Sequence, residues 1–327
     1  ASSGPAYETV SQLRQGGVGT GVLTPIEVLV PADKLDVAVR AAKGVDGVRM
    51  AVVGATRDGS ALVDVLPLNE TVDSTGTAVV QAVNSAVARA TGGPVGVTGS
   101  GAAVLDYASA VYDNFPYVLL IIALVTFVLL VRTFRSLLLP LKAVLLNLVS
   151  LAAVFGSVVF FWQEGHGSGA LFGVEPTGAI TFWLPVIIFA FLFGLSMDYE
   201  VFILARMREE YDATGSTKAA VIGGLGRTGR LITSAALILF FAFAALASAP
   251  GTDIKVLGTA LGVGILIDAT LVRALLVPAL VSVLGRWNWW LPAWLAKPLR
   301  VAPSPLAPSE PDPETPAPAR PDPVPTG

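Results

Sequence analysis

Two carboxylates and a phenol lie together inside a long, mostly apolar stretch of this chain. Asp198, Tyr199 and Glu200 fall in the segment from Ile180 to Ala205. A charged side chain in hydrocarbon costs about 2.5 to 3.5 kcal/mol on insertion scales, so such a group indicates a functional site. A buried carboxyl group can be neutral or charged, depending on its solvent access and its partner. The chemistry that this stretch predicts is proton transfer, with Asp198 as the carrier.

The helical positions of the three polar residues separate their expected roles. Gly194 lies one turn before Asp198, so its small size leaves room for a neighbouring helix close to the carboxyl group. Tyr199 is rotated by about 100° and would face a different neighbour, as the second member of a proton relay. Glu200 is rotated by about 200° from Asp198 and lies nearer to Arg206, so it either takes part in coupling or is a paired structural acid. Satisfied packing residues remain the alternative for all three.

A second pair of charges lies in the last apolar segment, at Asp268 and Arg273. Five residues of α-helix separate side chains by about 140°, which makes a poor pair within one helix. Each residue is therefore expected to have a partner on another helix, either in a structural ion pair or in coupling. Gly258 and Gly262 form a small-xxx-small face for close helix packing. Lys142, near the start of another apolar segment, is interpreted as an interfacial anchor.

The composition identifies a membrane protein and excludes several other classes. Hydrophobic residues make up 54% of the chain and charged residues only 14%, whereas soluble domains carry roughly 25% charged residues. There is no cysteine and a single histidine, His166, which falls in a loop. A relay within the apolar segments must then use carboxylates and hydroxyls.

Gly224 to Gly229 satisfies G-x-G-x-x-G but follows no strand, and no ATP-binding motif is present. No cofactor, metal, catalytic site or nucleic-acid partner is predicted.

The first part of the chain, residues 1–115, has the pattern of an α+β domain. Short apolar strands alternate with amphipathic helices in the order β-α-β-β-α-β, which is the ferredoxin-like order. The strands are expected at 26–30, 48–53, 61–66 and 95–98, and the helices at 33–43 and 74–90. Asp33 and either Asp73 or Ser74 are expected to cap these helices.

Five apolar segments follow, at 117–131, 137–162, 180–205, 231–249 and 256–284. About 20 apolar residues span a bilayer, and a helical pattern at 102–114 predicts one long first helix that rises from the α+β domain. Among the loops that connect or follow these segments, the Lys and Arg residues gather in alternate ones, which predicts that these loops are cytoplasmic and that the first domain is extracytoplasmic. All six tryptophans are expected at the two interfaces between the membrane and water. The predicted organisation is an extracytoplasmic domain (1–115), five membrane helices (116–285), an interfacial Trp/basic segment (286–300) and a disordered Pro-rich cytoplasmic tail (301–327).

An exported first domain requires a membrane segment before it. We therefore expect a segment upstream of this sequence, so that the five spans are the remainder of a six-span half.

Three motifs resemble the C-terminal half of an MMPL family transporter of the resistance-nodulation-division superfamily, of the actinobacterial type. They are Gly194-Leu195-Ser196-Met197-Asp198-Tyr199-Glu200, Gly226-Arg227-Thr228-Gly229-Arg230 and Gly264-Ile265-Leu266-Ile267-Asp268-Ala269-Thr270-Leu271-Val272-Arg273. The resemblance covers roughly residues 7–295. It implies a half-transporter with a porter-type domain, in which Asp198 and Tyr199 match the Asp-Tyr pair of this half.

The function that this resemblance implies is export of lipids or other hydrophobic molecules across the bacterial inner membrane, driven by the proton motive force. The expected partners are the lipid substrate, the N-terminal half of the transporter and further copies in an oligomer. An alternative stays open: a non-transporting, half-length membrane scaffold or lipid-sensing module. A native polypeptide of about twice this length, or an adjacent reading frame that encodes the other half, would favour transport.

Overall fold

A computed structural model of the chain describes residues 5–72 and 76–304. The expected caps Asp73 and Ser74, and most of the predicted Pro-rich tail, lie outside the described residues. The chain begins with the helix α1 (Pro5–Gln15), which the sequence did not lead us to expect, and a short 3₁₀ turn, η1 (Thr20–Leu23).

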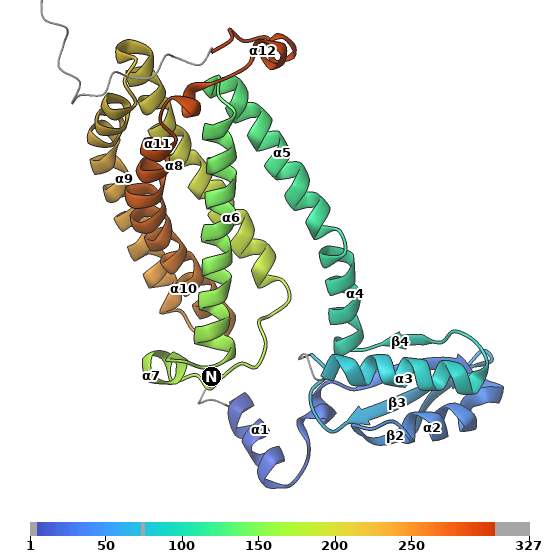
Figure 1. The fold of residues 1–327 in the computed structure, drawn as a ribbon. Coiled ribbons are helices and arrows are strands. Elements are labelled where there is room, and N and C mark those ends of the chain that lie inside the picture. Colours follow the sequence, from blue (N-terminus) through green and yellow to red (C-terminus); the bar gives the residue numbers. More distant parts are fainter. Residues whose placement is uncertain (1–4, 73–75, 305–327) are drawn as a thin grey trace, which may run out of the picture. The chain divides into compact units, whose positions relative to one another are not determined.

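A four-stranded antiparallel sheet follows (Figure 1), with the elements in the order β-α-β-β-α-β. The sheet has the strand order β2-β3-β1-β4. The strands are β1 (Ile26–Pro31), β2 (Val48–Arg57), β3 (Ser60–Pro67) and β4 (Gly96–Thr98), and the helices are α2 (Leu35–Lys43) and α3 (Gly76–Thr91). A 3₁₀ turn, η2 (Ala32–Lys34), precedes α2 and contains Asp33. Because α2 begins after this turn, Asp33 is not its N-cap.

One face of the sheet is packed by the two helices. In β3 the buried residues alternate with partly exposed ones, as expected of a strand with one face covered. The core joins alternate strand residues to the inner faces of α2 and α3, and its fully buried members include Val28, Ala38, Ala42, Val63, Val65, Val83 and Val87. The domain therefore has a hydrophobic core of its own.

Five helices among the described residues are long and apolar enough to cross a membrane: Ser100–Phe134, Leu138–Gln163, Leu184–Thr214, Thr217–Ala247 and Thr252–Trp289. The chain is therefore a multi-pass membrane protein. The first of these comprises α4 (Ser100–Tyr112) and α5 (Phe115–Phe134), with a turn at Asp113 and Asn114. The second comprises α6 (Leu138–Val158) and a short π-helical end, η3 (Val159–Gln163).

The third and fourth spans are the single helices α8 (Leu184–Thr214) and α9 (Thr217–Ala247). The fifth is divided into α10 (Thr252–Leu266), a π-helix η4 (Ile267–Leu276), α11 (Val277–Leu284) and a 3₁₀ turn η5 (Gly285–Trp289). Two short helices, α7 (Ser168–Phe172) and α12 (Ala293–Leu299), lie between the second and third spans and after the fifth. Pro278, which has no N–H to donate, is the second residue of α11, two residues after the π-helix ends.

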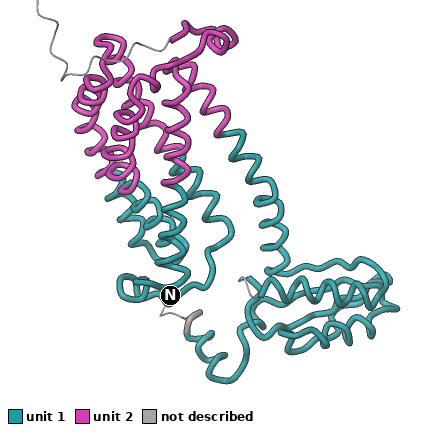
Figure 2. Tube along the Cα trace, viewed as in Figure 1, with its two compact units in different colours: residues 1–122, 151–193, 239–265 teal, residues 123–150, 194–238, 266–327 magenta. Residues whose placement is uncertain are grey.

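The chain divides into two compact units (Figure 2). One contains residues 1–122, 151–193 and 239–265, and the other contains residues 123–150, 194–238 and 266–327. All the polar residues that the sequence singled out for proton transfer or ion pairing belong to the second unit.

Candidate functional site

Asp198 lies on an exposed stripe of α8. Gly194, Asp198, Phe202 and Arg206 follow one another at intervals of four residues, and all four are exposed. The exposed fraction of Phe202 is 59%. The opposite side of the helix is packed, with Met197, Ile203 and Leu204 among its buried residues. α8 thus has one face against the rest of the chain and one face, with the carboxyl group of Asp198, that no described residue covers.

Asp268 and Arg273 form a direct ion pair. Arg273 Nη2 lies 2.6 Å from Asp268 Oδ2, and Arg273 Nε donates to the same oxygen at 2.7 Å. Our expectation that this spacing makes a poor pair within one helix was wrong, because both residues lie in the π-helix η4. A π-helix joins residues five apart through its backbone bonds, so residues at this spacing lie on the same side.

Ser196 connects this pair to α8. Its hydroxyl donates to Asp268 Oδ1 at 2.9 Å, and Arg273 Nη2 donates to both the Ser196 carbonyl and, at 3.1 Å, the Ser196 hydroxyl. Both oxygens of Asp268 therefore have donors. The guanidinium of Arg273 also lies over the ring of Tyr199, 5.3 Å from its centroid. Arg273 Nη1 is buried and has no acceptor among the described residues.

This arrangement separates the two members of the predicted relay. Tyr199 turns toward the Asp268–Arg273 pair, whereas Asp198 turns toward the uncovered face of α8. Tyr199 and Ser196, on the same helix as Asp198, both contact the buried pair.

Glu200 is buried, with 4% of its surface exposed. It does not pair with Arg206, which instead contacts Glu209 at 2.6 Å. Glu200 makes no hydrogen bond or ion pair with any residue in 5–72 or 76–304. It lines a cavity of about 10 Å³ together with Lys142 of α6, which is close to the space that one water molecule needs.

Lys142, which the sequence suggested as an interfacial anchor, is partly buried and has a polar partner. Its ammonium group donates to Asn288 Oδ1, and Asn288 is fixed because its amide nitrogen donates to the carbonyls of Val281 and Gly285 at 2.7 Å and 2.6 Å. Asp268, Arg273 and Glu200 are buried, and Lys142 is partly buried, so charged groups of both signs lie within this part of the protein.

The three glycines that the sequence selected lie in different surroundings. A Cβ atom on Gly258 would lie 2.6 Å from the Ala247 nitrogen, so α10 packs here against the backbone of α9. A Cβ on Gly262 would make ordinary contact with Phe240 at 3.7 Å. Around Gly194 there is no atom within 4 Å of such a Cβ in the described part of the chain. The room that Gly194 provides is therefore on the uncovered face of α8.

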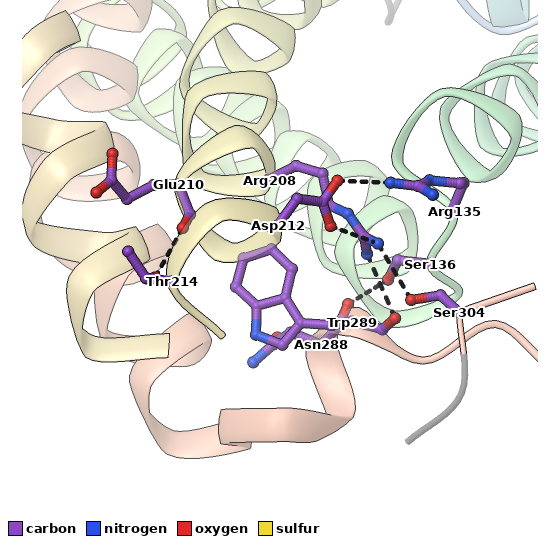
Figure 3. A network of polar contacts seen from close by, with 9 residues as sticks. All are labelled: Arg135, Ser136, Arg208, Glu210, Asp212, Thr214, Asn288, Trp289 and Ser304. Carbon is purple, nitrogen blue, oxygen red and sulfur yellow. Dashed lines mark hydrogen bonds and ion pairs between the residues drawn. The ribbon is translucent and has the colours of Figure 1, made fainter. Parts of the chain in front are cut away.

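The C-terminal end of α8 is held by a polar network (Figure 3). Arg208 Nη2 contacts Asp212 Oδ1 at 3.0 Å, and Asp212 Oδ2 contacts Arg135 at 2.5 Å. Arg208 also donates to the Trp289 carbonyl at 3.4 Å and to the Ser304 hydroxyl at 3.1 Å. This network joins the helix that carries Asp198 to the segment after the fifth span.

Two of the six tryptophans do not lie at an exposed interface. Trp162 is 1% exposed and donates to the Thr259 hydroxyl at 2.8 Å. Trp289, also 1% exposed, donates to the Thr217 hydroxyl at 3.0 Å. These two residues pack within the protein, whereas Trp287 and Trp294 remain exposed.

No group of three or more His, Cys, Asp or Glu side chains in residues 5–72 and 76–304 is placed to hold a metal ion. Sequence reasoning missed Ser196 and Lys142 as members of the buried polar cluster. Ser196 carried no signal beyond its position one turn before Glu200, and Lys142 carried a signal, an unpaired charge in an apolar segment, that was attributed to the interface.

The family profile described as MMPL family matches residues 32–304, which includes the sheet domain from η2 onward, all five candidate spans and every residue of the site. The chain belongs to the MMPL family. The resemblance to the C-terminal half of an actinobacterial MMPL transporter of the resistance-nodulation-division superfamily is confirmed.

Relatives of this MMPL chain are larger proteins. A membrane protein of Streptomyces coelicolor, SCO6666, is 46% identical over 64% of the chain and 29% of its own length. The heme uptake protein MmpL11 of Mycobacterium tuberculosis is 42% identical over 62% of the chain and 21% of its own length. The mycolic acid-containing lipids exporter MmpL11 of Mycolicibacterium smegmatis is 41% identical over 62% of the chain and 21% of its own length. The chain spans less than a third of the length of these relatives.

Proposed function

We propose that this chain forms one half of a transporter that exports lipids or other hydrophobic molecules across the bacterial inner membrane, in exchange for protons. The names of its relatives include a lipid exporter and a heme uptake protein, and both cargoes are largely apolar. Asp198 and Tyr199 act as one half of the proton relay. The other half of the transporter supplies the surface that faces Asp198.

The exposed stripe of α8 is the observation that carries this proposal. Asp198 lies on the same uncovered face as Gly194 and Phe202. If lipid covered this face, the carboxylate would cost about 2.5 to 3.5 kcal/mol or more. A second set of helices, packed closely at Gly194, removes that cost and gives the carboxyl group a polar partner. The stripe is therefore complementary to another protein surface rather than to lipid.

Protonation of Asp198 would change the charge balance beside the buried ion pair. Tyr199 lies under the guanidinium of Arg273. A shift of Asp198 and Tyr199 would therefore move Arg273, and with it the helix η4 and the contact with Ser196. Glu200 and Lys142 extend the buried charges along α8 and α6 and provide the path by which a proton leaves. An inward proton supplies about 1.4 kcal/mol per pH unit and about 2.3 kcal/mol per 100 mV, which together are enough to drive a change of helix packing.

The sheet domain is proposed to be a ferredoxin-like porter domain on the extracytoplasmic side. Its element order and its sheet order, β2-β3-β1-β4, support this. The helix α4 contacts α3, β1 and β4, so movement of the first span reaches the domain that handles substrate. In this arrangement residues 1–115 lie outside, 116–285 span the membrane, 286–300 lie at the inner interface and 301–327 extend into the cytoplasm.

The test is made in the intact transporter that contains this chain as one half. Asp198→Asn keeps the shape of the side chain and removes its ability to release a proton. We expect delivery of radiolabelled lipid to the cell envelope to fall to the level of cells without the transporter, while the amount of folded protein in the membrane is unchanged. Glu209→Gln is the matched control, because Glu209 is an exposed acid on the same helix as Asp198. It differs in being paired with Arg206. Export by Asp198→Asn that equals export by Glu209→Gln would refute the proposal.

A further inference from the structure

The short helix α12 packs by one side on the last turns of α5. Val131, Leu291 and Ala296 form the buried centre of this contact. Partly buried apolar residues surround them: Phe127, Leu137, Leu295, Leu299 and Val301. The attachment is reinforced by Arg132, whose Nη1 donates to the Leu299 carbonyl at 3.2 Å. The position of α12 relative to the end of α5 is thus fixed by both apolar and polar contacts.

Three basic residues gather where these two helices meet. Arg132, Lys297 and Arg300 are all exposed, and the bond from Arg132 to the Leu299 carbonyl places its guanidinium next to Arg300 in the chain. We call these three residues the α12 basic cluster. None of them has a carboxylate within ion-pair distance in the described part of the chain.

The surrounding sequence offers these cations no counter-charge. There is no Asp or Glu in residues 123–150 or 286–304. Asp212 is already bound by Arg135 and Arg208, at 2.5 Å and 3.0 Å. The charge of these exposed cations is therefore not neutralised within these segments and is available to an anion from outside them.

Large apolar side chains are exposed on α12 and on the segment of chain that leads to it. Trp294 of α12 leaves 72% of its surface uncovered, and Trp287 leaves 47%. Val283, at the end of the fifth span, is 81% exposed. Tryptophan next to Lys and Arg is typical of segments that lie at the boundary between lipid headgroups and acyl chains. This combination favours a lipid surface over a soluble anion.

We propose that the α12 basic cluster binds the phosphate headgroups of anionic phospholipids at the membrane surface on this side of the protein, with Trp294 inserted among the adjoining lipids. Arg132, Lys297 and Arg300 supply charge-assisted hydrogen bonds to phosphate oxygens. Basic residues near an anionic membrane surface each add to its attraction for the protein. The site is independent of transport: it holds the segment after the fifth span against the bilayer, whichever substrate the transporter carries.

The test compares lipid retention by the purified full chain. Native mass spectrometry counts bound phosphatidylglycerol and phosphatidylcholine with the same acyl chains, each added to the protein in detergent. We expect the wild-type protein to retain phosphatidylglycerol preferentially. Lys297→Gln together with Arg300→Gln should reduce that preference by about tenfold or more, since two cations are lost. This double variant keeps the Arg132–Leu299 bond and the apolar contact of α12, so it leaves the fold intact.

Lys218→Gln together with Arg230→Gln is the matched control, because it removes the same charge at two exposed positions outside the cluster. Its preference for phosphatidylglycerol should equal that of the wild type. Equal retention of the two lipids by the wild type, or equal losses in the two double variants, would overturn the proposal. So would a gain of phosphatidylglycerol binding in the full chain with Glu310→Gln, Asp312→Asn and Glu314→Gln, since the acidic tail would then be the occupant.

Discussion

The ion pair between Asp268 and Arg273 gives the strongest prediction about stability. Their side chains are 8% and 3% exposed, and the shortest contact between them is 2.6 Å. Asp268→Asn leaves the guanidinium buried without a negative charge beside it. Removing one member of a buried pair costs about 3 to 5 kcal/mol, mostly because the other charge loses its compensation. We expect the free energy of unfolding to fall by about this amount.

The double variant Asp268→Leu with Arg273→Met separates this cause from a general loss of packing. Because both charges are removed and the volume is approximately kept, it should be more stable than Asp268→Asn alone. Equilibrium unfolding of the full chain in mixed micelles, followed by circular dichroism, measures the free energies of the wild type, Asp268→Asn, the single variants Asp268→Leu and Arg273→Met, and the double variant. A loss below about 1 kcal/mol in Asp268→Asn, a typical value for a surface pair, would refute the reasoning. So would a double variant that loses the sum of the two single losses.

Two further predictions follow from close contacts in the membrane part. Gly258→Ala should destabilise the protein by about 1 to 3 kcal/mol, because its Cβ would lie 2.6 Å from the Ala247 nitrogen. Gly226→Ala, at a helical glycine with no atom within 4 Å of a Cβ, should be neutral or stabilising, and thermal unfolding of the two variants compares them. Tyr199→Phe keeps the ring beside Arg273, so its unfolding free energy should change by less than about 0.5 kcal/mol. Its proton-coupled export should nevertheless fall, and unchanged export would remove Tyr199 from the relay.

Much of the architecture could be predicted from periodicity and hydropathy. The four strands and the helices α2 and α3 of the first domain were located within a few residues, because alternation in Val28, Val63 and Val65 is a local property of the chain, whereas α1 was missed. The five membrane segments followed from apolar length alone. The boundaries were less accurate: β2 extends to Arg57 rather than Val53, since its pairing with β3 continues past the apolar residues.

The polar site was harder to predict because it depends on helix geometry and on neighbours distant in sequence. Regular α-helical geometry was assumed for Asp268 and Arg273, and the π-helix η4 changes which side each residue faces. Glu200 was associated with Arg206 by sequence distance, but the packing of α6 brings Lys142 to it instead. Similarly, Trp162 and Trp289 have the composition of interfacial anchors, and only their partners Thr259 and Thr217 show that they are buried.

Asp198 is proposed to carry the transported proton. Proton flux in proteoliposomes measures this step without the lipid substrate. The intact transporter is reconstituted with a pH-sensitive dye inside the vesicles, and a pH gradient is imposed across the membrane. We predict that Asp198→Asn abolishes the protein-dependent flux, while Glu209→Gln retains that of the wild type. Wild-type flux through the Asp198→Asn variant would show that Asp198 does not carry the transported proton.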